Sequence, residues 1–241
     1  MSLRTLSLLA SGLLLVALIA MMPLAFLHGM AGQPLGAQAS VYGRVWDGRL
    51  YNVAAGSARF SQVNAALRPA SLITGRAGFD WQIVDPNARG SGQGFVGFTG
   101  FGLREAQLTS RFRSLGLPVP AAMMDESLSL DLAELAFDDT GCVAADAVIR
   151  TSALMGLAAR YDVAAPMLEG ALSCRDRVLF ADLSGQSADM EIVLTLSLSS
   201  SGLYRWTAEA QILDASLTPV FSALGFTQDG AIWRQRGEGQ L

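Results

Sequence analysis

The sequence EIVLTLSLSSSGLYRWTAEAQIL, residues 191–213, decides the fold class of this chain. In its first part, Glu191–Ser199, apolar side chains recur at every second position. In its last part, Leu203–Leu213, aromatic and apolar residues share one face and polar residues share the other. Ser199-Ser200-Ser201-Gly202 lies between them and has the composition of a turn. A period of two is typical of a strand with one buried face, so the stretch predicts an antiparallel hairpin.

The same period of two recurs along most of the chain. In Phe79–Ile83, aromatic and aliphatic residues alternate with Asp80 and Gln82. Short helices are expected at Pro69–Thr74 and Leu217–Leu224, because a glycine follows each segment. We therefore expect a mainly β domain with a strand-rich, antiparallel, curved sheet, either a half-barrel or a folded-over sheet, and a few short helices. Further strands are expected over residues 41–46, 50–53, 57–67, 93–99, 103–112, 128–137, 143–150 and 178–184.

Local signals predict where this sheet turns and bends. Asp47-Gly48 fits a tight turn between the first two strands. The alternation of leucines in Leu128–Leu132 breaks at Ala133-Glu134 and resumes one residue out of phase, which predicts a β-bulge. Glycines crowd residues 90–102 with phenylalanines between them, but no lysine is present for a phosphate-binding loop. We interpret these glycines as bends and bulges of a curved sheet.

The N-terminal segment predicts a membrane anchor. Leu6–Leu27 spans 22 residues without a charge, and at about 1.5 Å per residue it can cross a bilayer core of about 30 Å. A single arginine precedes it, so the positive-inside rule places residues 1–5 in the cytoplasm. Residues 28–40 are expected to form a linker to an exported domain, residues 41–241. The alternative is a signal peptide cleaved near Ala37-Gln38-Ala39, which exports the same domain.

The content of basic residues excludes most catalytic chemistry. All 17 basic residues are arginines, and His28 is the one histidine. This excludes lysine Schiff bases, Ser-His-Asp and Cys-His catalysis, and metal sites that use histidine. A carboxylate-only hydrolase stays open as an alternative, although no spacing of acidic residues indicates one. We expect no catalytic residue, cofactor or metal, and the net charge of −4 argues against a nucleic-acid partner.

The two cysteines, Cys142 and Cys174, are expected to form a disulfide. An exported domain folds in an oxidising compartment, where paired cysteines are normally linked. Such a link contributes about 3–4 kcal/mol in the chain-entropy treatment. Two buried free thiols are the alternative.

An acidic run lies between Arg113 and Arg150, with no arginine inside it. We interpret it as a solvated strand face, because alternating leucines run through it. A docking surface for a basic partner is the alternative. The run consists of Asp125, Glu126, Asp131, Glu134, Asp138, Asp139 and Asp146.

Three motifs after the linker carry a family resemblance. GRVWDGR at residues 43–49 is followed by LRPASLITGR at 67–76 and by FDW at 79–81. In this order they resemble the type II secretion system protein N family, which has a Gly-x-Val-Trp-x-Gly motif and then a Leu-x-Pro-x-x-Leu-x-x-Gly turn. Gly141-Cys142 and the Leu-Gly-Phe…Asp-Gly segment at 224–230 are similar as well. The resemblance implies structural roles for Gly43, Trp46, Gly48, Pro69, Gly75 and Trp81.

The resemblance implies a single-pass accessory component of type II secretion in the inner membrane, with its C-terminal domain in the periplasm. Such proteins act in the export of folded proteins and are proposed to bridge the inner-membrane platform and the outer-membrane secretin. They have no known catalytic residues. In this interpretation, strand edges or an exposed sheet face bind the partner chains. The strand pattern also resembles AsmA-like envelope proteins, so a periplasmic lipid- or amphiphile-binding module is the alternative.

Overall fold

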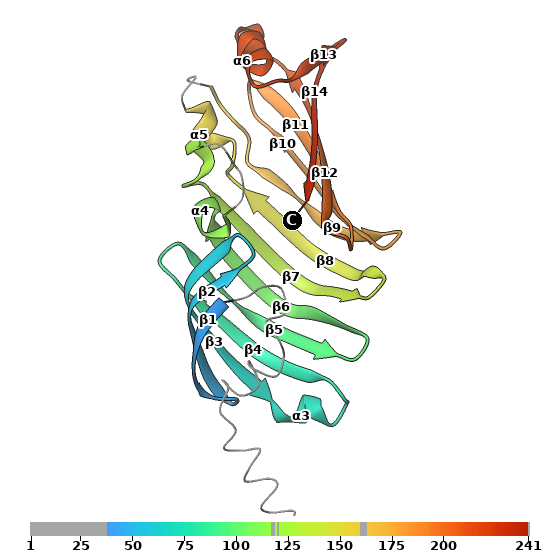
Figure 1. Ribbon diagram of the computed structural model, residues 1–241. Coiled ribbons are helices and arrows are strands. Elements are labelled where there is room, and N and C mark those ends of the chain that lie inside the picture. The colour runs from blue at the N-terminus through green and yellow to red at the C-terminus, as the bar shows by residue number, and fades with distance from the viewer. Residues whose placement is uncertain (1–37, 117–118, 120, 160–162, 241) are drawn as a thin grey trace, which may run out of the picture.

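The computed structural model describes residues 38–116, 119, 121–159 and 163–240. In that part of the chain, fourteen strands form one antiparallel sheet (Figure 1). Strands that follow one another in sequence are neighbours in the sheet, except that β14 lies between β12 and β13. The expected mainly β, antiparallel fold is confirmed. The strands are β1 (Gln38–Arg44), β2 (Asp47–Ala55), β3 (Ala58–Arg68), β4 (Ala77–Val84), β5 (Ala88–Gly97), β6 (Gly100–Arg111), β7 (Ser127–Asp138), β8 (Gly141–Thr151), β9 (Leu168–Arg175), β10 (Val178–Gln186), β11 (Met190–Leu198), β12 (Leu203–Ile212), β13 (Thr227–Asp229) and β14 (Ile232–Gln240).

Short helices connect some of the strands. The helices expected at Pro69–Thr74 and Leu217–Leu224 are present in shorter form, as α3 and α6. Within the described ranges, no helix combines the length and the apolar composition needed to span a membrane. The expected anchor, Leu6–Leu27, lies outside the described residues. The helices are α3 (Pro69–Leu72), α4 (Phe112–Leu115), α5 (Met155–Ala158) and α6 (Thr218–Ala223), with 3-10 turns η2 (Ala121–Met123) and η3 (Ala215–Leu217).

The stretch at residues 191–213 folds as the expected hairpin of β11 and β12. Leu194 pairs with Ala208 across the two strands. The backbone N–H of Ser199 donates a hydrogen bond to the carbonyl of Leu203 at 3.0 Å. Gly202 has a φ of +79°, which a glycine adopts without a steric penalty. The turn composition therefore predicted the right place for this link.

The first hairpin turns two residues earlier than expected. Its turn consists of Val45 and Trp46, and Asp47-Gly48 begins β2 instead. Val45 is 4% exposed, and its carbonyl accepts a hydrogen bond from the N–H of Leu67 at 2.9 Å. Burial of this side chain and the bond to β3 hold the turn here, although Asp-Gly has the more usual turn composition.

The expected β-bulge at Ala133-Glu134 is confirmed. Leu132 pairs with Ala147 and Glu134 pairs with Asp146, so Ala133 is the extra residue on β7. Because one residue is inserted, the apolar side chains before and after it stay on the same face of the sheet.

A second bulge lies at the same level, between β5 and β6. The register shifts between Ser91 and Gln93, and Glu105 opposite them has a φ of +46°. A Cβ at Gly92 would lie 2.5 Å from the Cβ of Ala106. The interpretation of the glycine segment as a bulge is therefore confirmed at this position.

The sheet has one apolar and one polar face, because successive side chains of a strand point to opposite sides. Residues that pair across neighbouring strands lie on the same face, so the pairs from β6 to β14 trace the apolar face across the sheet. The pairs form a single row of small or apolar residues: Ala106, Leu132, Ala147, Leu172, Ala181, Leu196, Trp206 and Gly237. The face that carries this row is called the apolar face below, and the opposite one is called the polar face.

The core lies on the apolar face in two linked clusters. In the larger one, Leu217 of η3 and Phe221 of α6 pack on strand residues such as Ile192 and Trp233. The smaller cluster consists of Ala106, Leu132 and Ala147 on neighbouring strands. Leu172 of β9 contacts both clusters, so the core is continuous.

The expected disulfide is present between Cys142 of β8 and Cys174 of β9, with 5.6 Å between the two Cα atoms. The ladder of β8 and β9 joins residues 147–151 to residues 168–172. The disulfide therefore links the two strands beyond the end of their hydrogen-bonded ladder.

Candidate functional site

The apolar face is covered unevenly from one end to the other. At the end near α5 and α6, Leu217 is 1% exposed and Phe221 is 5% exposed (Figure 1). At the other end of the strands, Val96 is 52% exposed and Phe101 is 49% exposed. The helices α4 and α6 thus bury side chains at one end of the strands, whereas α3, at the other end, buries none of its residues and leaves the apolar face there open.

The open end carries a group of aromatic side chains. The ring of Phe101 stacks on that of Phe137, with 5.6 Å between the centroids and 19° between the planes. Phe98, in the turn between β5 and β6, is 100% exposed. Val96, Phe98, Phe101 and Phe137 are called the apolar rim below. An exposed apolar group of this kind favours contact with another molecule.

Arginines on the polar face pair with acids on neighbouring strands. Arg104 Nη2 lies 2.7 Å from Glu134 Oε1, and Arg150 Nε lies 3.0 Å from Glu169 Oε2. The hydrogen bonds that Arg150 donates to Glu169, and after them the negative charge of Glu169, raise the pKa of Arg150. Exposed pairs of this kind each contribute about 1 kcal/mol or less. Further pairs on this face are Arg68–Asp80, Arg175–Asp182, Arg205–Glu238 and Arg234–Glu209.

Several members of the acidic run have arginine partners that lie outside the run. Asp125 pairs with Arg113, and Asp138 pairs with Arg177. The side-chain hydrogen bond from Thr140, further backbone hydrogen bonds and the Arg177 charge outweigh desolvation and lower the pKa of Asp138 to about 2. Asp125, Glu134 and Asp138 are thus engaged in ion pairs with arginines of the same chain, which favours the solvated strand face over a docking surface.

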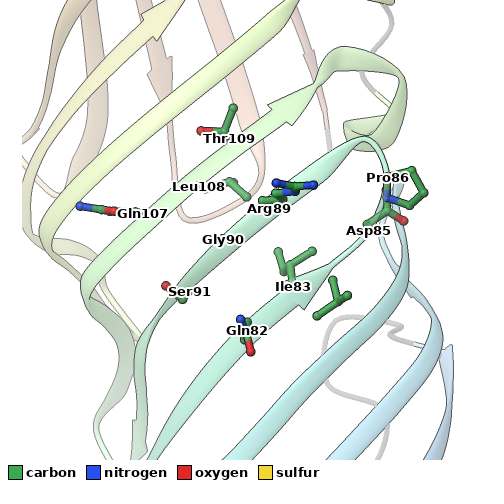
Figure 2. Close-up of a pocket in the computed structure, with 11 residues that line it drawn as sticks. Gln82, Ile83, Asp85, Pro86, Arg89, Gly90, Ser91, Gln107, Leu108 and Thr109 are labelled. Carbon is green, nitrogen blue, oxygen red and sulfur yellow. The ribbon is translucent and has the colours of Figure 1, made fainter.

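A hollow of about 700 Å³ lies on the polar face over β4, β5 and β6 (Figure 2). At its edge, the Asp85 carboxylate accepts hydrogen bonds from the N–H groups of Ser61 and Asn87, each at 2.8 Å. Burial raises the pKa of Asp85, but these hydrogen bonds and the one from the Ser61 hydroxyl outweigh it and lower the pKa overall. The carboxylate therefore holds the turn between β4 and β5. The polar side chains that line the hollow are Gln82, Arg89, Ser91, Gln107 and Thr109.

Three of the six residues singled out by the motifs lie in one cross-strand row. Gly43 pairs with Gly48, Gly48 with Ala65, and Ala65 with Trp81. A Cβ at Gly43, which has a φ of +90°, would lie 2.3 Å from the carbonyl oxygen of Asp47. These residues pack strands closely together, and Gly43 also lines a hollow of about 390 Å³ together with Tyr42, Asp47, Arg49 and Tyr51.

The other three motif residues lie in two connections. Trp46 is half-buried in the turn between β1 and β2. Pro69 begins α3, and Gly75 has a φ of +72° just before β4. None of the six belongs to the apolar rim. In the sequence, three of the four rim residues lie among the glycines of residues 90–102, a pattern that predicts bends of the sheet and gives no sign of an exposed apolar group.

Over the described ranges, no three His, Cys, Asp or Glu side chains gather closely enough to hold a metal ion.

A family model described as "Type II secretion system (T2SS), protein N" matches residues 37–234. The match runs from the start of the sheet into its last strand, β14, and it confirms the resemblance carried by the motifs. Comparisons with curated proteins and with solved structures gave no significant match.

Proposed function

Because this chain belongs to the type II secretion system protein N family, we propose that it is an accessory structural component of type II secretion without enzymatic activity. In this proposal Leu6–Leu27 anchors the chain in the inner membrane, and the domain of residues 41–241 stands in the periplasm. There it docks on other secretion components, the inner-membrane platform or the outer-membrane secretin, and helps folded proteins cross the outer membrane.

The apolar rim is the observation that carries this proposal. On the polar face, arginines and acids are largely paired with each other across the strands. At the rim, Val96 and Phe101 each leave about half of their surface in water. Burying such surface against a partner gains about 25 cal/mol per Å². Docking on the rim therefore buries exposed apolar surface and leaves the ion pairs of the polar face in place.

A matched pair of substitutions tests the proposal in cells that secrete through this system. Val96 is 52% exposed on the apolar face, and Val193 is 42% exposed on the polar face. In a strain that lacks the gene, Val96→Gln should restore clearly less secreted protein than the wild-type chain at equal chain levels. Val193→Gln should restore wild-type secretion. Full secretion with both variants would remove the rim from the mechanism.

Binding of an amphiphile is the second candidate, and it has its own observation. The indole Nε1 of Trp81, on the apolar face, is buried and has no hydrogen-bond partner among the described residues. A ligand with an apolar chain and an acceptor atom would satisfy both the face and this donor. Native mass spectrometry of the purified full chain should then show a lipid-sized adduct. A folded chain without such an adduct would contradict this candidate.

A further inference from the structure

The outer edge of β14 is open over its second half. β13 has three residues and pairs only with Ile232–Arg234 at the start of β14. In the described part of the chain, no strand pairs with the outer side of residues 235–240. An unpaired edge of this length is a template for another strand.

The phase of the hydrogen bonds shows which residues offer their backbone groups at this edge. The hydroxyl of Thr227 donates to the carbonyl of Arg234 at 3.1 Å, so that carbonyl points towards β13, away from β12. The register of β14 against β12 continues without a shift. Because backbone groups of an antiparallel strand alternate in direction, Arg236, Glu238 and Gln240 direct their N–H and C=O groups outward.

The side chains at this edge are self-complementary. Arg236 and Glu238 are both exposed on the polar face, on either side of Gly237. Glu238 Oε2 lies 3.2 Å from Arg205 Nε, whereas Arg236 has no ion pair among the described residues. A strand that pairs antiparallel with this edge would form two ion pairs if it placed an acid opposite Arg236 and a base opposite Glu238. The β14 strand of another copy meets this condition, because its own Glu238 and Arg236 follow in the reverse order.

We propose that β14 pairs antiparallel with β14 of a second copy, about a twofold axis at Gly237. Arg236 then lies directly opposite the partner's Glu238, and Glu238 opposite the partner's Arg236. Both pairs join residues whose backbone groups point outward, so the backbone bonds and the ion pairs form in the same register. Such an isologous contact closes after two copies.

The apolar side of the same edge supports this register. The ring of Trp206 lies over Gly237: a Cβ there would be 2.6 Å from the indole Nε1. At the twofold axis two such rings approach each other, one from each copy, and cover the glycine backbone from water. Because β13 already pairs with Ile232–Arg234, the contact is limited to residues 235–239 of β14 in each copy.

The other edge of the sheet, β1, is less suited to this role. The register of β1 shifts between Gln38 and Ser40, and Gly43 has a φ of +90°. Both irregularities interrupt the row of outward backbone groups. The pairing proposed for β14 does not rest on the role in secretion.

Two charge reversals test the pairing with the full chain in detergent solution. In a dimer of Arg236→Glu, Glu at position 236 lies opposite the partner's Glu238. In a dimer of Glu238→Arg, Arg at position 238 lies opposite the partner's Arg236. Because two pairs change at once, each variant alone should weaken the dimer about tenfold or more. An equal mixture restores both opposite-charge pairs, and native mass spectrometry should show the mixed dimer with an affinity close to that of the wild type.

Arg89→Glu is the control, since Arg89 is another arginine without an ion pair on the polar face of the described sheet. It should dimerise like the wild type. Circular dichroism shows whether each variant keeps its β-sheet. A wild-type chain that is monomeric at about 0.1 mM, well above the dissociation constants of ordinary interfaces, would overturn the proposal. So would folded variants whose mixture stays monomeric.

Discussion

The ring of Phe79 on β4 lies over Gly94, its cross-strand partner on β5: a Cβ at Gly94 would be 2.3 Å from Phe79 Cζ. The same arrangement recurs where Phe95 covers Gly102. Strand glycines therefore provide the space in which a neighbouring aromatic ring lies flat on the backbone.

Gly94→Ala should lower the free energy of unfolding by about 1–3 kcal/mol, because the ring of Phe79 must leave its position. Urea denaturation of the domain measures this. Gly97→Ala is the control, since a Cβ there would lie 3.4 Å from the flexible side chain of Arg76. Equal stabilities of the two variants would show that the ring has room to move.

Removal of the disulfide should cost more than any ion pair on the polar face. The double variant Cys142→Ser and Cys174→Ser is expected to lose about 3–4 kcal/mol of stability, because the unfolded chain is no longer constrained. Urea midpoints of both forms measure the loss. Mass spectrometry with a thiol reagent should find no reactive thiol in the folded wild-type chain. Two labelled thiols would refute the link.

Asp138 should make the stability depend on pH in acid. Its pKa is about 2 in the folded chain, below the ordinary value of 3.8. A carboxyl with a lowered pKa stabilises the fold fully above its unfolded pKa and loses this effect as the pH falls through the folded one. Between about pH 4 and pH 2, the urea midpoint of Asp138→Asn should therefore fall less than that of the wild type. Asp139→Asn, at the neighbouring position, should follow the wild-type curve, and identical slopes for all three chains would contradict this role of Asp138.

Alternation of apolar residues was enough to predict most of the sheet. It located β11 and β12, and the break at Ala133 located the bulge, because both signals come from one buried face. It missed β9 and β14. In β14, Gly237 and Gly239 occupy positions on the apolar face where an ordinary strand has apolar side chains. The rings of Trp206 and Tyr204 on β12 lie over these glycines and occupy that space. Such a strand has no apolar pattern of its own.

Some features were predicted at the wrong residues or were not predicted, because they depend on contacts between residues that are distant in sequence. The first turn was expected at Asp47-Gly48, but burial of Val45 and its bond to Leu67 place it earlier. The pairing of Arg104 with Glu134 depends on the register of β6 and β7, which composition does not reveal. The apolar rim depends on where the short helices stop covering the sheet. Sequence therefore predicted the two faces of the sheet and left open which part of the apolar face is exposed.

Site-specific crosslinking tests the docking role of the apolar rim most directly. A photoreactive amino acid replaces Val96 in one strain and Val193 in another, in cells with an intact secretion apparatus. Position 96 should crosslink to another component of the apparatus, whereas position 193, of similar exposure on the polar face, should not. A chain that is present at normal levels and crosslinks from neither position, or equally from both, would contradict docking through the rim.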